Sequence, residues 1–448
     1  MDTQLLLELQ AAYIRELEKR IEDLEDRLEK YEQTKNSRNS SLPPSKDQNR
    51  PFKSKSLREQ TGKKPGGQTG HEGNTLKMVS NPDFIINHIP DYCSCCGQSL
   101  KEVPTELQEK RQIIDLPEIK PQVTEHRIYQ KQCSCGHITK CAPPEGLKNR
   151  IIYGNNIAGL NAYLSVRQYI PFKRLQEIFF DIFSIGISEG GLHELLKRVT
   201  NRAYPVYQQI KGKIVRSDIV GSDETGTKIN GANKWIWTWQ NPELTFIAVS
   251  NNRGTETIRN NFEKGFAHSI LVHDCWKSHF KTEALSHQVC IAHLLRELNG
   301  LSEQYKNSWS EEFRQLLLKA LEYKKQLKPE DYLQPQKRTM FFESWLESII
   351  EKVIDPNQKD LIAFQKRMRK YKSFILTFLH LPKVPPDNNG SERAIRNIKV
   401  KQKISGQFKS YEGATAFAIL RSVTDTAIKN GQNVLNALTS VAKYQGAD

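Results

Sequence analysis

The chain has 448 residues and a formal net charge of +15. This length predicts two to four domains and at least one substantial core. The sequence has no apolar run of about 18 residues, and acidic residues interrupt its apolar N-terminal stretch, so we expect neither a transmembrane helix nor a signal peptide. We therefore expect a cytoplasmic protein without a membrane partner. Its positive charge is unevenly distributed along the chain, which favours a polyanionic partner.

Residues 7–31 carry apolar side chains at heptad spacing, between mostly charged residues. The two apolar positions of the heptad are filled by Leu7, Ile14, Ile21, Leu28 and by Leu17, Leu24, Tyr31. Three heptads predict a short coiled coil over residues 1–34, which would make the protein a homo-oligomer. A single amphipathic helix packed on its own chain is the alternative.

Residues 35–80 are polar, basic and rich in Pro, Gly and Ser. This composition predicts a flexible linker. Its lysines, Lys63 and Lys64 among them, are candidates for contacts with DNA phosphates.

Six of the eight cysteines fall between residues 93 and 141, which in a cytosolic chain indicates metal binding before disulfides. Two closely spaced groups with strand-like sequence between them predict a zinc-ribbon-like β region over residues 81–150, holding a structural Zn²⁺. The expected ligands are Cys93, Cys96, Cys133 and Cys135, with the fourth position open among Cys135, His137 and Cys141.

Residues 151–212 show helical periodicity, in segments 158–170, 172–183 and from 189 onward, with a Gly-containing turn at 184–188. A helix, a turn and a helix with basic residues nearby are compatible with a helix-turn-helix DNA-binding region. A plain helical bundle is an equal alternative.

From residue 215 the pattern changes to strands. Strands are expected at 219–229, 234–240, 244–250 and 269–274, with helices at 255–262 and 290–301. The order β-β-β-α-β-α is the ribonuclease-H-like arrangement. The predicted fold is therefore multidomain α+β, with a catalytic core over 213–302 and 386–448 and an α-helical insertion over 303–385.

Three acidic residues stand at separate places in this arrangement. Asp223 lies in the first strand, Asp274 ends the fourth strand, and Glu392 begins a polar helix after 117 intervening residues. Three converging carboxylates suit two Mg²⁺ (or Mn²⁺) ions that serve phosphoryl transfer. Without metal, such carboxylates would repel each other, which is hard to explain in a purely structural protein.

Each acid has an alternative interpretation. Glu224 could replace Asp223 as the ligand, since alternation puts the two on opposite faces of the strand. Asp274 could cap the following helix. Glu392 could form a capping box with Asn389, and the bare sequence does not choose between Glu392 and Asp387.

The chain resembles the DDE transposases of insertion-sequence family 66 over nearly all its length. The resemblance rests on NSRNSSLPPSKD, on GKKPGGQTGHEG with the paired cysteines, on SDETGTKI around the first acid and on HDCWKSHF around the second. The most specific motif, DNNGSERAIRNIKVKQKISGQF, selects Glu392 over Asp387 as the third acid.

The resemblance also implies roles for residues beside the acids. Cys290 and His293, in a C-x-x-H motif, would lie near the active site with Arg296. A second metal site made by His287, Cys290 and His293 is the less favoured alternative to a packed cysteine with a hydrogen-bonded histidine. DNA phosphates would be contacted by Arg393, Arg396, Lys399 and Lys401, and the basic segment 365–372 is a further candidate.

The implied function is cleavage of double-stranded DNA at transposon ends, followed by transfer of the freed 3′-OH into target DNA. Such a protein would be associated with the nucleoid, and accessory proteins of the same element are plausible partners. Two alternatives are a zinc-containing DNA-binding regulator with an inactive core and a nuclease of the same fold without strand transfer.

Overall fold

The computed structural model describes residues 13–14, 16–18, 20–21, 76–144, 146–147, 149–334 and 336–444. The chain divides into two compact units, Pro51–Pro121 and the remainder. Within the predicted coil the described residues are helical and exposed. The rest of that coil, and the predicted linker with Lys63 and Lys64 up to residue 75, lie outside the described residues.

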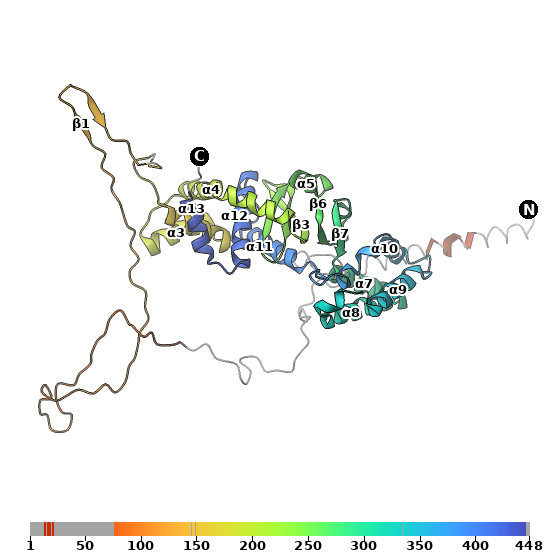
Figure 1. The fold of residues 1–448 in the computed structure, drawn as a ribbon, viewed down its shortest axis with the longest axis horizontal. Coiled ribbons are helices and arrows are strands. Elements are labelled where there is room, and N and C mark those ends of the chain that lie inside the picture. Colours follow the sequence, from red (N-terminus) through yellow and green to blue (C-terminus); the bar gives the residue numbers. More distant parts are fainter. Residues whose placement is uncertain are drawn as a thin grey trace, which may run out of the picture. The chain divides into compact units, whose positions relative to one another are not determined.

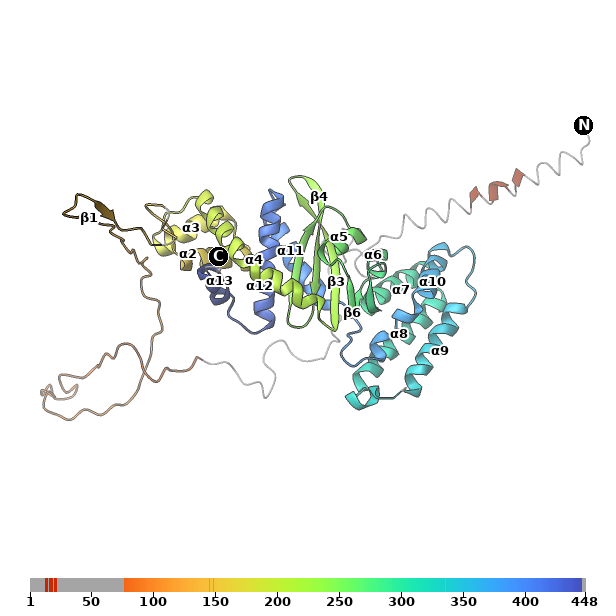
Figure 2. The same ribbon diagram turned by 45° about the horizontal axis from the view of Figure 1, so that its top comes forward.

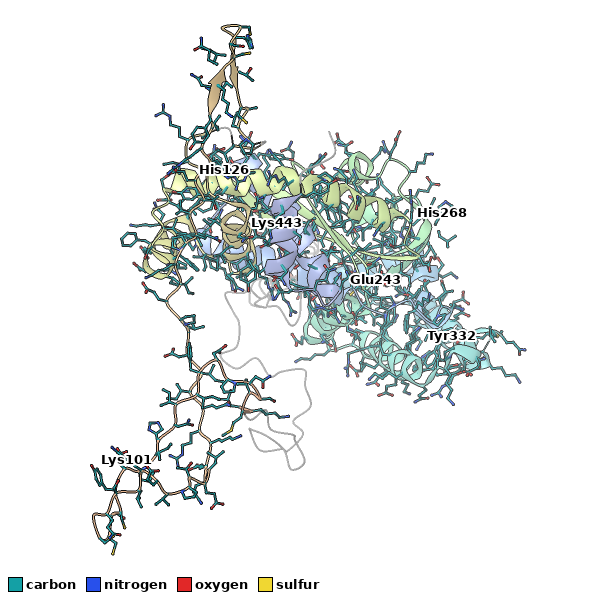
Figure 3. The ribbon with its side chains drawn as sticks, turned by 60° about the vertical axis from the view of Figure 1, so that its left-hand side comes forward. Lys101, His126, Glu243, His268, Tyr332 and Lys443 are labelled. Atoms are coloured by element: carbon teal, nitrogen blue, oxygen red, sulfur yellow. The ribbon has the colours of Figure 1, made fainter. Side chains whose placement is uncertain are left out.

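The described part of the Pro51–Pro121 unit contains a tight turn at its first cysteine group. Tyr92 and Ser99 form an antiparallel bridge around Cys93–Gly97, and the Cys93 N–H donates to the Gln98 carbonyl at 2.8 Å. Side chains project into solvent along most of this segment, as around Lys101 (Figure 3).

A second hairpin carries the other cysteine group. Strands β1 (Gln130–Gln132) and β2 (Ile138–Lys140) pair antiparallel, and Cys133–His137 form the turn between them. The predicted strand-like sequence before this hairpin is paired only within β1. Several of its apolar side chains are exposed, and Ile113 is 94% exposed.

The helical region contains helices as predicted. They are α2 (Asn155–Ala162), a π-helical turn η1 (Tyr163–Arg167), α3 (Phe172–Phe183) and α4 (Glu189–Val215). The turn before α4 ends at Ser188, whose hydroxyl caps the helix by accepting the Gly191 N–H at 3.1 Å. The helix α13 (Val434–Lys443) packs against α2, so the end of the sequence joins this region.

A five-stranded mixed sheet forms the centre of the chain. Its strands are β3 (Ile219–Ile229), β4 (Ala232–Gln240), β5 (Thr245–Ser250), β6 (Phe266–His273) and β7 (Ala284–Val289), in the order β5-β4-β3-β6-β7. The β3-β4-β5 part is antiparallel, whereas β6 lies parallel to β3 and β7 parallel to β6. The meander expected from the Asn230-Gly231 turn is therefore present.

Strand β7 was not predicted, because its sequence is polar. Two of its polar side chains are nevertheless buried and hydrogen-bonded. The Gln288 amide donates to the Ile375 carbonyl at 3.0 Å and accepts the Phe378 N–H at 2.7 Å. Those partners lie about ninety residues further along the sequence, where a local pattern gives no signal.

Helices cover the sheet on both faces. The short α5 (Thr255–Asn261) lies on the face that carries Trp237 and Trp239, and α11 (Asn389–Ser405) packs on β3 and β4 from the other face. Helices α4 and α12 (Tyr411–Lys429) lie along β5, on the side away from β7 (Figures 1 and 2).

The edge strand β5 is closed by side chains of α12. The Thr245 N–H donates to the Thr426 hydroxyl at 3.1 Å, and the Ile247 N–H donates to the Ser422 hydroxyl at 2.9 Å. These bonds satisfy backbone groups that an open edge would offer to another strand.

Beyond β7 lies a helical subdomain with a hydrophobic core of its own (Figure 2). Its elements are α6 (Lys277–Phe280), α7 (Ile291–Tyr305), α8 (Ser308–Gln326), η2 (Pro329–Tyr332), α9 (Lys337–Glu351), α10 (Lys359–Lys370), η3 (Lys372–Phe374) and η4 (Thr377–Leu379). The helices predicted between Asp274 and Glu392 are thus present. No helix in the described part of the chain combines the length and apolar character needed to cross a bilayer.

Basic residues of the segment 365–372 are engaged in ion pairs with nearby acids. Arg367 lies 2.6 Å from Glu297, Arg369 lies 3.2 Å from Glu351, and Lys372 lies 2.8 Å from Glu347. The pairs of Arg369 and Lys372 are about half exposed and therefore weak, so phosphate contact by this segment stays a prediction.

Candidate functional site

Asp223 and Asp274 occupy equivalent positions on neighbouring strands. The parallel pairing of β3 and β6 ends at Gly221 and Val272, and each acid lies two residues beyond that last pair. In parallel strands, residues in matching register point to the same side of the sheet. The backbone alone therefore places these two carboxylates next to each other.

The pKa of Asp223 is affected by the other two predicted acids. Burial raises the pKa of Asp223 well above its ordinary value, and the negative charges of Glu224, Asp274 and Glu392 raise it further. No basic side chain in the described part of the chain forms an ion pair with Asp223. Its Oδ1 accepts the N–H of Glu224, at 2.8 Å. Asp274 and Glu392 therefore both act electrostatically on Asp223, although the three acids come from three separate elements.

Glu224, the alternative to Asp223, points to the opposite face of β3 and is already paired. Its oxygens lie 2.5 Å from Arg253 Nε and 3.1 Å from His279 Nε2. Burial would raise the pKa of Glu224, but the hydrogen bond and charge of His279, with those of Arg253, hold it below its ordinary value. This environment is that of a structural carboxylate, and it favours Asp223 as the acid free to bind a ligand.

Asp274 follows β6 directly and is held in place by two groups. Its Oδ1 accepts the N–H of Trp276 at 3.0 Å and lies 3.6 Å from His279 Nε2. The alternative role as a helix cap is therefore met only in part, because Asp274 lies two residues before the N-cap of α6. The buried His279 links Asp274 to Glu224. Sequence reasoning missed it, although it lies in the HDCWKSHF motif.

Glu392 stands in the first turn of α11, where side chains of α7 reach it. Arg296 donates to its Oε1 at 2.8 Å, and His293 Nε2 lies 3.9 Å from the same oxygen. The helix is capped at Asn388, whose side chain makes no cap hydrogen bond, so the arrangement differs from the Asn389 capping box considered as an alternative. Arg396 is 4.0 Å away and its side chain is 74% exposed.

The start of α11 is fixed to the sheet by Asn388, a residue to which the sequence assigned no separate role. The Asn388 amide donates to the Ser222 carbonyl at 2.7 Å and accepts the Ser391 hydroxyl at 2.7 Å. Its backbone N–H donates to Cys290 Sγ at 3.2 Å. Asn388 therefore joins β3, α7 and α11 immediately beside the acids.

A glycine on β3 makes this close approach possible. A Cβ atom at Gly221 would lie 2.5 Å from Gln240 Nε2, 2.7 Å from Asn388 Oδ1 and 2.8 Å from Ser391 Oγ. Carbon atoms in proteins do not approach polar atoms so closely. A larger residue would push the start of α11, and Glu392 with it, away from Asp223.

The C-x-x-H motif lies beside the acids, as the resemblance implied. Cys290 is buried at the start of α7, and burial raises its pKa to about 12. Burial and the nearby Arg296 lower the pKa of His293. His287 instead bonds His273, with 2.9 Å between His273 Nε2 and His287 Nδ1. These contacts fit a packed cysteine and a positioned histidine better than a second metal site.

The four basic residues predicted on α11 fall into two groups. Arg393 and Arg396 are exposed. Lys399 donates to the Gly226 carbonyl at 2.7 Å, and burial lowers the pKa of Lys401. The two arginines are therefore the better placed to meet a phosphate.

The two cysteine turns share a local geometry, although they lie in different units. The backbone N–H groups of Cys96 and Cys95 lower the pKa of the Cys93 thiol, and the Cys135 N–H and side chain act likewise on Cys133. Gly97 and Gly136 lie within these turns with φ of +75° and +86°, a region that favours glycine. Stabilised thiolates in tight turns are the form that Zn²⁺ binds, so the donor groups fit zinc.

The acids also fit the chemistry of a hard divalent cation. Three carboxylates offer oxygen ligands, and burial together with the neighbouring negative charges raises the pKa of Asp223, so a bound cation would stabilise its charged form. Across the residues that the structure describes, no three His, Cys, Asp or Glu side chains are arranged as a closed metal-binding group. Glu392 is turned toward Arg296 instead.

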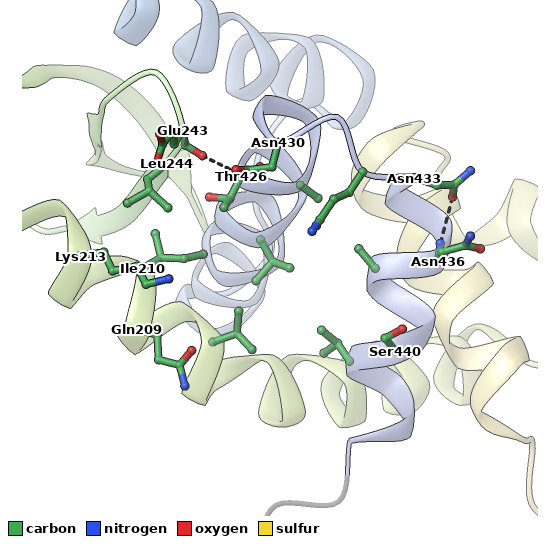
Figure 4. Close-up of a pocket in the computed structure, with 16 residues that line it drawn as sticks. Gln209, Ile210, Lys213, Glu243, Leu244, Thr426, Asn430, Asn433, Asn436 and Ser440 are labelled. Carbon is green, nitrogen blue, oxygen red and sulfur yellow. Dashed lines mark hydrogen bonds between the residues drawn. The ribbon is translucent and has the colours of Figure 1, made fainter. Parts of the chain in front are cut away.

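A pocket of about 720 Å³ lies elsewhere, between α4, α12, α13 and the β4–β5 turn (Figure 4). Its rim is polar, with the Asn430 amide donating to the Glu243 carbonyl at 2.8 Å and the Asn436 N–H donating to Asn433 at 3.0 Å. None of the predicted acids or cysteines lines it.

Comparison with known families identifies the family of the chain. The sequence profile described as the Transposase IS66 family matches residues 150–416, more than half of the chain. The zinc-finger binding domain of transposase IS66 matches residues 90–136, and a family of unknown function matches residues 3–77. Among curated proteins, no sequence matches significantly. The chain belongs to the IS66 transposase family, and it carries that family's zinc-finger domain.

Proposed function

We propose that the protein cleaves DNA at the ends of a transposable element and joins the freed 3′-OH ends to target DNA, using Asp223, Asp274 and Glu392. One observation carries the proposal. Asp223 and Asp274 each lie two residues beyond the last parallel pair of β3 and β6, and the charges of Asp274 and Glu392 both raise the pKa of Asp223, which forms no ion pair with a basic side chain among the described residues. Carboxylates brought together at such an electrostatic cost indicate a functional site.

The strand order supports a ribonuclease-H-like core. An antiparallel β3-β4-β5 meander is followed by two parallel strands, with the first acid on the central strand and the second directly after its parallel neighbour. In this proposal the core comprises 213–302 and 386–448, and the helices of 303–385 are an insertion. A coil over 1–34, a linker over 35–80, a zinc region over 81–150 and a DNA-binding helical region over 151–212 precede the core.

Two Mg²⁺ (or Mn²⁺) ions bound by these acids would activate the attacking oxygen and stabilise the leaving oxygen. The residues of the chain orient the acids. Arg296 and His293 fix Glu392 from α7, and His279 fixes Asp274 from α6. Water first attacks the phosphodiester at the transposon end and releases a 3′-OH. That 3′-OH then attacks a target phosphodiester, so one phosphodiester replaces another and no nucleotide cofactor is needed.

Other parts of the chain would bring DNA to the acids. Arg393 and Arg396 are exposed on the helix that carries Glu392, where phosphates of a bound strand would pass. A zinc site made by Cys93, Cys96, Cys133 and Cys135, with His137 or Cys141 as a possible replacement, would stabilise the two turns. The N-terminal coil would pair two protomers, each bound to one transposon end.

The test uses a duplex carrying the inverted repeats that flank the coding gene, with purified protein and Mg²⁺. We expect a 3′-OH nick at the repeat end, and joining of a pre-cut end to a second DNA. Nicking without joining would indicate a nuclease of the same fold. Binding without either reaction would indicate a DNA-binding regulator and would contradict the proposal.

A further inference from the structure

Trp276 presents an exposed indole two residues after Asp274. Its relative exposure is 38%, high for a large aromatic side chain, and the Asp274 side chain nearby is 24% exposed. The backbone N–H of Trp276 donates to Asp274 Oδ1 at 3.0 Å, so the backbone that carries the ring is tied directly to a predicted catalytic carboxylate.

The ring is fixed in place by Arg253. Trp276 Nε1 donates to the Arg253 carbonyl at 3.2 Å, and the Arg253 guanidinium lies 3.9 Å from the centre of the ring. Two independent contacts with one residue leave the indole little freedom to turn. A fixed aromatic surface loses little entropy when a ligand stacks on it.

Arg253 is itself anchored from the protein interior. Its Nε bonds the buried Glu224 at 2.5 Å, and its guanidinium lies 5.1 Å from the ring of Trp235. The Arg253 side chain is still 33% exposed. An exposed ring and a partly exposed cation therefore lie together on one rigid support, beside Asp274.

We propose that Trp276 is a stacking surface for an unpaired nucleobase next to the phosphodiester on which the acids act. This inference rests on the proposed function and adds a binding site to it. Any base offers a flat π face to an aromatic ring, and Arg253 adds a positive charge that suits the phosphate of the same nucleotide. Stacking would compensate for unpairing that base, and so expose the phosphodiester to the acids.

Photo-crosslinking tests the contact without relying on cleavage. The probe is the inverted-repeat duplex with 5-iododeoxyuridine at one position at a time across the terminal and flanking nucleotides. Irradiation of this base joins it to an aromatic ring on which it stacks. With Ca²⁺ in place of Mg²⁺, we expect a crosslink mapped to Trp276 at one or two positions. Absence of a Trp276 crosslink at every position would overturn the inference.

A second test measures the energetic role of the ring. Trp276→Leu should slow single-turnover cleavage of a fully paired end by roughly 5- to 150-fold, the range for loss of one stacked base. A mismatch at the crosslinked position should restore most of that loss, because the base is then already unpaired. Trp276→Phe should retain most activity, and Phe341→Leu, at an exposed aromatic on α9, should change nothing.

Equal slowing of paired and mismatched ends by Trp276→Leu would show that the ring only packs on Arg253, and would overturn the inference. This outcome is distinct from failure of the proposed function, in which the unaltered protein cleaves neither end in Mg²⁺. In that case the crosslink alone decides whether Trp276 stacks on a base.

Discussion

Asp223 and Glu224 are adjacent in sequence and have opposite environments. Alternation along β3 turns Glu224 toward Arg253 and His279, and turns Asp223 toward Asp274 and Glu392. The same chemical group is therefore stabilising at one position and destabilising at the next. A carboxylate kept where it destabilises the metal-free fold indicates a requirement other than folding.

Substitution of these two neighbours should have opposite effects on stability. In metal-free buffer near neutral pH, Asp223→Asn should leave the free energy of unfolding unchanged or raise it, because it removes a charge with an elevated pKa. Glu224→Gln should lower it by up to about 3 kcal/mol, the lower part of the range for a broken buried pair, because Arg253 keeps some solvent contact. Chemical denaturation of both variants tests this, and equal losses would contradict it.

His287 should make the fold sensitive to acid. Burial and the charge of His279 lower its pKa from 6.5 to about 4 in the folded protein. As the pH falls, His287 therefore takes up a proton in the unfolded chain before it does so in the folded protein. Above pH 6.5 this group does not reduce the free energy of unfolding, and between pH 6.5 and 4 it reduces it progressively. The slope is at most about 1.4 kcal/mol per pH unit for one group. Thermal midpoints measured over this range should fall less steeply in His287→Gln, and parallel curves would refute this.

At the scale of elements, the position of α11 decides where Glu392 lies. The helix rests on β3 through Asn388, through the space left by Gly221, and through Lys399, which bonds the Gly226 carbonyl. Helix α7 holds the same turn from the other side, through Cys290 and Arg296. The Asn-Asn motif and the C-x-x-H motif thus contact each other at the start of α11.

Asn388→Ala should loosen this contact. It removes the bond to the Ser222 carbonyl and leaves that buried group unpaired, which should lower the free energy of unfolding by about 1–3 kcal/mol. The cleavage rate should fall by more than the loss of folded protein accounts for, because Glu392 is no longer held in position. The matched control is Asn389→Ala at the exposed neighbouring asparagine. Equal activity of the two variants, measured well below their melting temperatures, would contradict this role.

The sequence predicted elements whose signals are local and missed contacts that are not. The strand patterns of β3 and β4 and the Asn230-Gly231 turn identified the meander, and periodicity identified α3 and α4. Strand β7 was not predicted because its buried polar residues form hydrogen bonds with groups that are distant in sequence, as Gln288 does with the Ile375 carbonyl. For the same reason His279 and Asn388 received no role, since their partners Glu224 and Ser222 are distant in sequence.

At the scale of the whole molecule, the zinc-finger domain and the sheet with its acids are stabilised by different means. The sheet is enclosed by helices and has a large hydrophobic core. The two cysteine turns instead lie in exposed segments with few packing contacts. In such a segment, metal binding supplies much of the folding energy.

Removal of zinc should therefore affect the cysteine turns and spare the sheet. We expect the purified protein to contain bound zinc, and Cys133→Ser to lose it. Proteolysis should then become faster within residues 90–141, while the main thermal transition stays in place. Ser134→Ala is a matched control within the same turn. An unchanged zinc content in Cys133→Ser would contradict the assigned ligand.

The central claim is that Asp223, Asp274 and Glu392 carry out strand transfer. The most direct measurement is the single-turnover joining of a pre-cut transposon end to target DNA in Mg²⁺, with folding checked by circular dichroism. Asp223→Asn, Asp274→Asn and Glu392→Gln should each reduce joining by on the order of 100-fold or more, whereas Asp387→Asn, at the rival acid, should keep most of it. Full activity in Asp223→Asn, or loss in Asp387→Asn alone, would contradict the claim.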